Sequence, residues 1–296
     1  MSARYFHCWC LLCAAALLLC IVSVLGFILL SGMPAMNITL FFGDTDPLAA
    51  IMGWAPIWEG IWPACVGTMA VVGGALLLAL LPGLATGIWL ATAKTGRTHM
   101  LLELAVDILA GIPSVLMGLF GFTLILLLRH WLLPSANTSL ALSAVCLALL
   151  VIPYLAVATR TAIQALPASL TLTALSLGMT HWQTLWSVLL PCAQRGIRGG
   201  IMLAFGRAAE DTAVIMLTGA VVNAGLPGGI FERFEALPFT IFYYSAQYQS
   251  DAELQMAFGA ALTLLCLTAT VFSLTGLSMR PNLKEASHAD CHANPQ

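Results

Sequence analysis

Three charged side chains stand close together in the segment AFGRAAEDTAVIMLTGA, residues 204–220, which is otherwise mostly apolar. Arg207 and Glu210 are three residues apart, and Arg207 and Asp211 are four apart, so on one helix all three lie near one face and can pair. A charge at the centre of a bilayer costs about 2.5–3.5 kcal/mol on insertion scales. If this segment crosses a membrane, its charged face is expected to point toward protein or an aqueous path.

The residues alone leave two interpretations of this cluster open. In one, it is an internal ion pair that only helps helices to pack. In the other, Arg207 is a transient site for a passing anion, and Asp211 holds and releases the arginine, because a planar guanidinium fits oxyanions such as phosphate or sulfate. Arg207 also lies near one end of its segment, so its side chain could extend to the membrane surface.

The composition indicates that lipid, rather than water, surrounds most of the chain. Hydrophobic residues make up 60% of its 296 residues, charged residues make up 8%, and the mean hydropathy is +0.95. Ordinary globular domains have about 25% charged residues. We therefore predict an all-α polytopic membrane protein. About 20 apolar residues cross a bilayer as a helix, which predicts six spans at approximately 8–30, 64–93, 101–128, 139–160, 200–222 and 254–277.

Two of these spans contain residues that break helices. Leu81-Pro82-Gly83 interrupts the second span and Gly111-Ile112-Pro113-Ser114 interrupts the third. We predict breaks at Pro82, Gly111 and Pro113. Non-helical backbone at membrane depth persists only where protein or a water-filled cavity covers it, so the breaks indicate either a transport path or simple kinks between packed helices.

The positions of Lys and Arg predict the orientation, because these residues are in excess on the cytoplasmic side. With both termini in the cytoplasm, the outer side receives only Arg129 and Arg233. The residues placed inside are Arg4, Lys94, Arg97, Arg160, Arg195, Arg198, Arg280 and Lys284.

The chain is expected to have three parts. Residues 1–60 hold a first transmembrane helix, whose apolar run is too long for a signal peptide, and an outer loop; residues 61–278 form the main membrane domain. Residues 279–296 form a polar, disordered cytoplasmic tail. His288, Cys291 and His292 in this tail could bind a metal, but a solvated tail is the simpler interpretation, and no metal site is predicted.

Two outer segments, 31–63 and 223–253, are rich in Trp and Tyr. Such residues are typical of the aromatic belt at a membrane surface; docking of an external partner is the alternative. The sequence contains no G-x-x-x-x-G-K-[ST], H-E-x-x-H or G-x-S-x-G motif. We therefore predict no catalytic residues, no cofactor and no ATP hydrolysis by this chain.

A polar interruption at residues 174–200 carries a recognisable loop pattern. Permeases of ABC importers have a cytoplasmic loop that reads E-A-A, three residues, Gly, nine residues, Ile-x-Leu-Pro. Here Leu172-Thr173-Ala174 stands where the pattern has E-A-A, and it is followed by Gly178, Val188, Leu190 and Pro191. The chain resembles these permeases, and in particular the phosphate importer permeases of the PstA/PstC type, closer to PstA. The segments that carry the closer resemblance are LAGIPSVLMGLFG (109–121), LGMTHWQTLWSVLLP (177–191), GRAAEDTAVIMLTGA (206–220) and ALPFTIFYYSAQY (236–248).

The resemblance implies an ABC-importer type I permease core with a cytoplasmic coupling helix. It implies that Arg207 is a transport residue, with Glu210, Asp211 and Thr212 beside it in the substrate pathway. The family usually reads R-A-x-G-E-T at this place, so Glu210-Asp211 replaces Gly-Glu, and Leu172 replaces the glutamate of the loop.

The same loop is then expected to couple to a separate ATPase. A short helix around Ala174–Thr180 would dock on the ATPase, Gly178 would allow the following turn, and Trp182, Leu185 and Trp186 would give an apolar docking face at helical spacing. Val188, Leu190 and Pro191 complete the loop. The alternative is an amphipathic helix that lies on the membrane without a partner.

The function implied is the permease subunit of an ATP-driven importer of inorganic phosphate in the bacterial inner membrane. The expected partners are two ABC ATPase subunits, a second permease subunit and a periplasmic phosphate-binding protein. The alternatives are a permease for sulfate, molybdate or phosphonate, a secondary transporter that works without an ATPase, and a membrane enzyme, which the lack of catalytic motifs disfavours.

Overall fold

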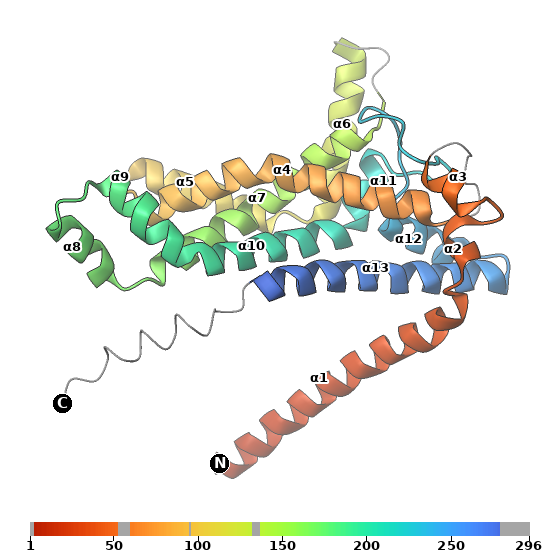
Figure 1. Cartoon of the computed structure of the whole chain (residues 1–296), viewed down its shortest axis with the longest axis horizontal. Coiled ribbons are helices and arrows are strands. Elements are labelled where there is room, and N and C mark those ends of the chain that lie inside the picture. The colour runs from red at the N-terminus through yellow and green to blue at the C-terminus, as the bar shows by residue number, and fades with distance from the viewer. Residues whose placement is uncertain (1–2, 53–59, 95, 132–136, 279–296) are drawn as a thin grey trace. The chain divides into compact units, whose positions relative to one another are not determined.

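The computed structural model describes residues 3–52, 60–94, 96–131 and 137–278, and its regular secondary structure is helical (Figure 1). The predicted tail at 279–296 lies outside the described residues, as do Trp54, Trp58 and Glu59 of the outer loop. The helices are α1 (Ala3–Gly32), α2 (Ile38–Phe42), α3 (Pro47–Ile51), α4 (Trp62–Thr92), α5 (Arg97–Gly111), α6 (Ser114–Trp131), α7 (Leu140–Gln164), α8 (Ala168–Ser176), α9 (His181–Thr184), α10 (Leu190–Glu210), α11 (Thr212–Thr218), α12 (Leu237–Gln247) and α13 (Asp251–Ser278).

The predicted all-α polytopic class is confirmed, but the count of six continuous spans is wrong. Within the described residues, 5 helices are long and apolar enough to cross a membrane: Tyr5–Ala35, Trp62–Thr92, Ser114–Trp131, Leu140–Gln164 and Asp251–Leu274. The predicted fifth span at 200–222 is not one helix. It consists of the end of α10, an extended residue at Asp211 and the short helix α11.

The predicted break at Pro82 is also wrong, because α4 continues through this residue. Proline removes one backbone hydrogen bond, which membrane helices tolerate where neighbouring groups compensate. The adjacent Gly83 has another role. A Cβ atom built there would lie 2.7 Å from Cβ of Leu155 on α7, so glycine lets α4 and α7 approach closely.

The predicted break at Gly111 and Pro113 is confirmed. Helix α5 ends at Gly111, Ile112 has an extended backbone with φ −71° and ψ 123°, and α6 begins at Ser114. The residue before a proline is disfavoured in the helical region, which explains why Ile112 is extended and the helix stops two residues before Pro113. The predicted third span therefore divides into two helices.

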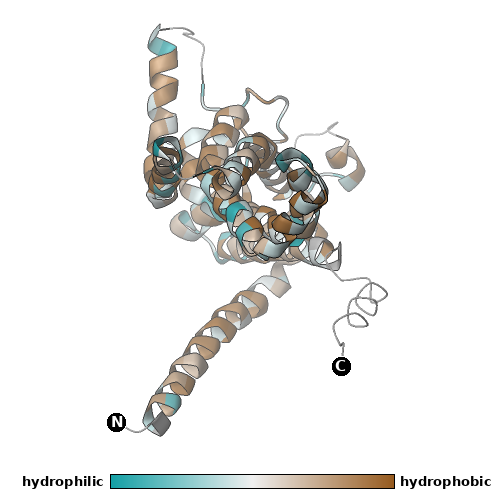
Figure 2. Ribbon diagram, turned by 90° about the vertical axis from the view of Figure 1, so that its left-hand side faces the viewer, coloured by the Kyte–Doolittle hydropathy of each residue, from teal (hydrophilic) through white to brown (hydrophobic). Residues whose placement is uncertain are grey.

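Helix α1 is hydrophobic over most of its length (Figure 2), and the 18-residue window that marks it as a candidate span is 0% buried. A helix that is apolar on all sides is stable only where lipid or another protein chain covers it. Its C-terminal part packs within its own unit, where the rings of Phe27 and Phe258 lie 5.4 Å apart.

The chain divides into two compact units that do not follow sequence order. Unit 1 comprises Met1–Val71, Gly118–Ser143 and Asp211–Leu265, and unit 2 comprises Val72–Met117, Ala144–Glu210 and Cys266–Gln296. Each unit is described by itself. The division between Glu210 and Asp211 falls inside the predicted transport segment, so Arg207 belongs to unit 2 and Asp211 to unit 1.

In unit 2, helices α4, α7 and α10 lie side by side, and α8 lies beyond their ends (Figure 1). Small residues allow this packing. A Cβ atom at Gly87 of α4 would lie 2.6 Å from Cβ of Thr159 on α7, and one at Gly196 of α10 would lie 2.6 Å from Cβ of Ala162. Helices in membranes associate through such small residues because lipid provides no hydrophobic drive between them.

In unit 1, the segment after α11 packs on the start of α4. The backbone N–H of Leu237 donates to the hydroxyl of Thr68 at 2.8 Å, and both residues are buried. At Gly67, one residue earlier on α4, a Cβ atom would overlap the carbonyl oxygen of Glu235. Glycine is therefore required at position 67 for the loop to reach this place.

Candidate functional site

Arg207 lies in the last turn of α10 in unit 2. Its side chain is 25% exposed and its Nη1 lies 3.5 Å from Oε1 of Glu210, whose side chain is 69% exposed. An ion pair at such a distance, with one partner mostly in solvent, is worth only ~0–1 kcal/mol. The predicted pairing of Arg207 with Glu210 is confirmed, and this pair by itself is weak.

The helix that carries Arg207 is held rigidly against its neighbours in unit 2. Gly196 and Gly200 lie one turn apart on α10 and face Ala162 and Ala158, one turn apart on α7; a Cβ atom at Gly200 would overlap Cβ of Ala158. Such contacts at i and i+4 let two helix backbones approach closely. The close packing of α10 on α7 therefore determines where Arg207 lies in unit 2.

Asp211 has a structural role that the sequence analysis did not predict. It lies outside α10, with φ −78° and ψ 96°, and it is the N-cap of α11. Its Oδ1 accepts a hydrogen bond from the backbone N–H of Val214 at 2.9 Å, and the residue is 3% exposed. The prediction that Arg207, Glu210 and Asp211 share one helical face is wrong, because aspartate is among the preferred N-cap residues and here it starts a new helix.

Helix α11 is fixed within unit 1 by polar and close apolar contacts. The hydroxyl of Thr218 lies 2.8 Å from that of Ser143 on α7, and the backbone N–H of Ser139 donates to the carbonyl of Thr218 at 3.0 Å. At Gly118 on α6, a Cβ atom would lie 2.9 Å from the carbonyl oxygen of Ala213. Thr212, the first residue of α11, is half-buried. The cap and these contacts together fix the direction of α11.

The turn that follows α8 shows why the loop pattern requires a glycine. The backbone N–H of Gly178 donates to the carbonyl of Leu175 at 3.0 Å, and that of Met179 donates to the carbonyl of Ala174 at 3.2 Å. These two bonds form a Schellman motif, whose first residue after the helix must be left-handed. Gly178 has φ +82°, so the predicted turn at this glycine is confirmed.

The next helix starts with a complete capping box. The hydroxyl of Thr180 accepts from the backbone N–H of Gln183, and Oε1 of Gln183 accepts from that of Thr180 at 2.8 Å. The predicted helix at Ala174–Thr180 is therefore displaced: α8 ends at Ser176, and the last residues of that range form the turn and cap.

A π-helical turn at Leu185–Leu189 joins α9 to α10. It contains Val188 and directly precedes Leu190 and Pro191, which are the first two residues of α10. The backbone N–H of Leu190 bonds to the carbonyl of Leu185, five residues earlier, and Pro191 has no N–H to donate. Single π-helical turns are frequent at functional sites, and this one ends immediately before the Leu-Pro of the loop pattern.

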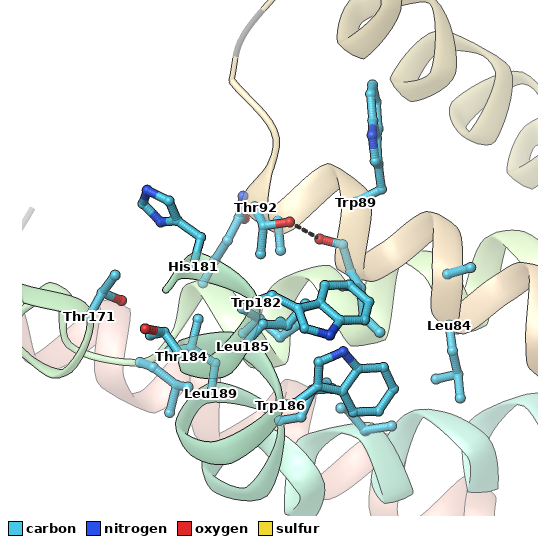
Figure 3. A pocket seen from close by; sticks show the side chains of 18 of the residues that line it. Leu84, Trp89, Thr92, Thr171, His181, Trp182, Thr184, Leu185, Trp186 and Leu189 are labelled. Carbon is cyan, nitrogen blue, oxygen red and sulfur yellow. Dashed lines mark hydrogen bonds between the residues drawn. The ribbon is translucent and has the colours of Figure 1, made fainter. Parts of the chain in front are cut away.

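The predicted apolar docking face is only partly present. Leu185 is buried, so it is not available to a partner, whereas Trp182 and Trp186 are 67% and 53% exposed. The two indole rings lie 5.5 Å apart, and Figure 3 shows them pointing from the loop toward the side of Leu84 on α4. The three side chains do not form one outward face. The π-helical turn changes the helical register by one residue, which straight α-helical spacing did not anticipate.

The family of the chain follows from sequence comparison. A family described as binding-protein-dependent transport system inner membrane component matches residues 83–280, a range that includes both α8–α10 and the break at Asp211. The chain belongs to this family. It is therefore the inner-membrane component of a transport system, as the loop pattern predicted.

Several relatives carry more specific names. The chain is 32% identical over 215 residues to phosphate transport system permease protein PstA 1 of Mycobacterium tuberculosis, which covers 72% of this chain and 68% of the relative. It is 29% identical to PstA of Xylella fastidiosa, with 88% of both chains covered. It is also 27% identical to PstC of Pasteurella multocida, over 89% of this chain and 90% of the relative.

Solved structures support the fold. A chain of the MetNI methionine ABC transporter in an inward-facing conformation superposes with a TM-score of 0.56 at 17% identity, covering 80% of this chain and 98% of the other. A chain of an amino acid ABC transporter gives a TM-score of 0.53 at 16% identity, covering 80% and 99%. The predicted ABC-importer permease core is confirmed. As a transport permease, the chain is not an enzyme: it works with a separate ATPase and a substrate-binding partner.

Sequence reasoning missed a partly buried polar cluster of the permease in unit 2, in which His99 is buried and Glu103 and Arg160 are partly exposed. His99 on α5 lies 3.1 Å from the carbonyl of Leu90 through Nε2, and 3.6 Å from Glu103 through Nδ1. Glu103 also pairs with Nη1 of Arg160 on α7 at 2.7 Å. The cluster therefore ties the end of α4 to α5 and α7. Glu103 and Arg160 are 57 residues apart in the chain, so no local pattern indicated their pairing.

Sequence reasoning also gave no special role to Glu235 in unit 1. This residue is 6% exposed, and its Oε1 accepts from the backbone N–H of Gly225 at 2.9 Å. Burial raises the pKa of this carboxyl to about 7, although hydrogen bonds from the backbone of Gly225 and Ala224 lower it. Glu235 thus ties the end of the loop between α11 and α12 to Gly225 within the same loop, and a pKa of about 7 means that its charge changes near neutral pH.

Proposed function

We propose that this chain is the permease subunit of an ATP-driven importer of inorganic phosphate. Its relatives named PstA and PstC support this cargo. The assembly we propose contains this permease domain, residues 61–278, a second permease, two ATPase subunits and a periplasmic phosphate-binding protein. This chain carries the anion across the membrane and makes or breaks no covalent bond.

Arg207 is the residue proposed to contact the passing anion. Its guanidinium is only partly exposed, it is carried by a rigidly packed helix, and its pair with Glu210 is long and half in solvent. A phosphate ion offers a doubly charged, bidentate acceptor that competes well for an arginine. Glu210 then weakens the binding enough for release, and Asp211 and Thr212, which follow directly in the chain, set where the helix of Arg207 gives way to α11.

The coupling element proposed is α8 with the turn at Gly178. Leu172 and Leu177 are 65% and 77% exposed, whereas Ala174 is buried and holds α8 to the rest of unit 2. Two large exposed apolar side chains beside a rigid Schellman turn suit insertion into a groove of the ATPase. The capping box at Thr180 and the π-helical turn connect this element directly to α10, and hence to Arg207.

The orientation of the chain in the membrane is proposed from the Lys and Arg residues that predicted it in the sequence. Lys94 and Arg97 lie at the α4–α5 connection, Arg160 lies near the end of α7, and Arg195 and Arg198 lie near the start of α10. All five belong to the end of unit 2 that carries α8. This end is therefore assigned to the cytoplasm, together with both termini.

Phosphate uptake by cells that carry Arg207→Gln tests this function. Loss of a contact made during passage of the anion should lower uptake at least tenfold at an unchanged amount of protein in the membrane, which is about 1.4 kcal/mol or more. Arg198→Gln is the matched control, because Arg198 is an exposed arginine of the same helix that pairs with Gln194 at 3.1 Å. Normal uptake by Arg207→Gln would remove Arg207 from the pathway.

Competition between anions for uptake identifies the cargo. Glu210-Asp211 replaces the Gly-Glu that is usual in the family. Because of this difference, another oxyanion is a second candidate for the transported substrate. A phosphate importer should lose uptake of labelled phosphate only to unlabelled phosphate, whereas stronger competition by sulfate, molybdate or a phosphonate would reassign the cargo. Uptake that persists when the ATPase subunits are removed would indicate a secondary transporter and overturn the whole proposal.

A further inference from the structure

A large apolar groove lies beside the loop in unit 2, and neither cargo transport nor the ATPase accounts for it. Its volume is about 1030 Å³, at the upper limit of the ~300–1,000 Å³ usual for small-molecule sites. Its walls come from the second half of α4, the end of α7, α9 with the π-helical turn, and the start of α10. All of its lining residues belong to unit 2.

The walls of this groove leave aromatic and aliphatic surface uncovered. Leu81 is 79% exposed, and the indoles of Trp182 and Trp186, which meet edge to face, stand in the groove (Figure 3). An open apolar surface of this size marks a place where lipid or another protein chain makes contact. Tryptophan side chains are typical of the level at which acyl chains meet lipid headgroups, because the ring is apolar and its N–H is polar.

The charges around the groove restrict what the occupant can be. Among the described residues that line it, Lys94 carries a permanent positive charge and none is acidic. Lys94 follows the last residue of α4 by two positions and is exposed. The remaining polar lining includes His181 and Thr92, and the hydroxyl of Thr92 already donates to the carbonyl of Ile88 at 2.8 Å. A ligand that fits this groove has an apolar body and an anionic head.

We propose that the groove binds an anionic phospholipid of the inner leaflet, with an acyl chain along Leu81, Trp182 and Trp186 and the headgroup phosphate at Lys94. Basic pockets between membrane helices on the cytoplasmic side are suited to such headgroups. The ammonium of lysine reaches the headgroup level while its methylene chain stays on the apolar wall. The bound lipid fills the space between α4 and the π-helical turn, and so supports the connection from α8 to α10.

Quenching of tryptophan emission by brominated lipid tests this site. The full chain is reconstituted in phosphatidylcholine vesicles with a minor fraction of phosphatidylglycerol, and bromine is placed on the acyl chains of one lipid at a time. Selective binding predicts that brominated phosphatidylglycerol quenches more than its share of the lipid mixture. This excess should fall strongly in the double variant Trp182→Phe/Trp186→Phe and persist in Trp131→Phe, whose tryptophan is 75% exposed on α6 and does not line the groove.

Charge variants complete the test. Lys94→Gln should reduce the excess about fivefold, because one lysine near a membrane surface contributes that much to the binding of anionic lipid. Arg97→Gln is the control, since Arg97 is an exposed cation three residues away that does not line the groove. Quenching in proportion to the lipid mixture, or an equal effect of both charge variants, would overturn the proposal. Loss of the excess quenching when the second permease and ATPase subunits are added would also overturn the proposal, because a protein would then occupy the groove. Neither reading depends on phosphate uptake, so this proposal and the transport function fail separately.

Discussion

Two interruptions of the helical chain are built in opposite ways. At the α8 turn, defined as residues Ala174–Gln183, exposed backbone is satisfied by a Schellman motif and a capping box. In the α11 region, defined as residues Asp211–Leu237, buried carboxylates of Asp211 and Glu235 accept hydrogen bonds from backbone N–H groups. Local backbone hydrogen bonds organise the first interruption, and buried carboxyl oxygens that accept hydrogen bonds organise the second.

This difference predicts unequal sensitivity to mutation. Water can replace a lost hydrogen bond at an exposed turn, whereas a buried N–H that loses its acceptor keeps the full cost of its desolvation. Changes in the α11 region should therefore destabilise the protein more than comparable changes at the α8 turn. Four substitutions test this ranking, beginning with the largest expected effect.

The largest effect is expected from ionisation of Glu235. Its folded pKa of about 7 exceeds the reference of 4.5, so the folded state retains a proton that the unfolded state releases between these values. Stability should therefore be greatest below about pH 4.5, fall as the pH rises to about 7, and then level off, by roughly 3 kcal/mol in total at ~1.4 kcal/mol per pKa unit.

Thermal unfolding of the purified chain across this pH range measures this effect of Glu235. Glu235→Gln keeps an acceptor for the N–H of Gly225 and should remove the decline. The explanation fails if the variant shows the same pH dependence as the original chain.

The next effect is expected at Asp211. Asp211→Ala removes the cap of α11 and leaves the buried N–H of Val214 without its acceptor, which should cost about 2 kcal/mol of unfolding free energy. Asp211→Asn retains a capping oxygen and should cost far less. Unfolding midpoints of both variants, measured under one condition, provide the comparison. Equal losses would show that the charge, rather than the cap, is what matters at this position.

A smaller effect is expected at Gly178. Its φ of +82° is left-handed, so Gly178→Ala should cost about 1 kcal/mol. Gly199→Ala is a control of opposite sign: Gly199 is helical, no atom would lie within 4 Å of its Cβ, and alanine should stabilise that helix by up to ~1 kcal/mol. ATP hydrolysis stimulated by the binding protein, measured beside stability, should fall in Gly178→Ala alone. An unchanged rate would remove the turn from the coupling mechanism.

The smallest effect is expected at Thr180. Thr180→Ala removes one side of an exposed capping box and should cost about 0.5–1 kcal/mol, whereas Thr180→Ser keeps the hydroxyl and should be close to neutral. The same unfolding assay applies. A loss in Thr180→Ala as large as that in Asp211→Ala would contradict the ranking of the two regions.

The two regions also differ in how far the sequence predicted them. The turn at Gly178 was predicted because spacing within one loop pattern carries the information. The cap at Asp211 was missed although aspartate before an apolar run is a helix-start signal, because the spacing of Arg207, Glu210 and Asp211 fits a single helix equally well. The break at Pro113 was correct and that at Pro82 was wrong, since packing of Gly83 against Leu155 favours a continuous α4.

The sequence by itself determined the class, the membrane environment and the family, because composition, apolar length and motif spacing are all local properties of the chain. Only the tertiary structure decided that Asp211 begins a helix, that Leu185 is buried while Trp182 and Trp186 line a groove, and that Glu103 pairs with Arg160. Each of these depends on which distant segments come into contact. Burial and close helix packing determine the energetic effect of a polar group or a glycine, and neither is encoded at the residue itself.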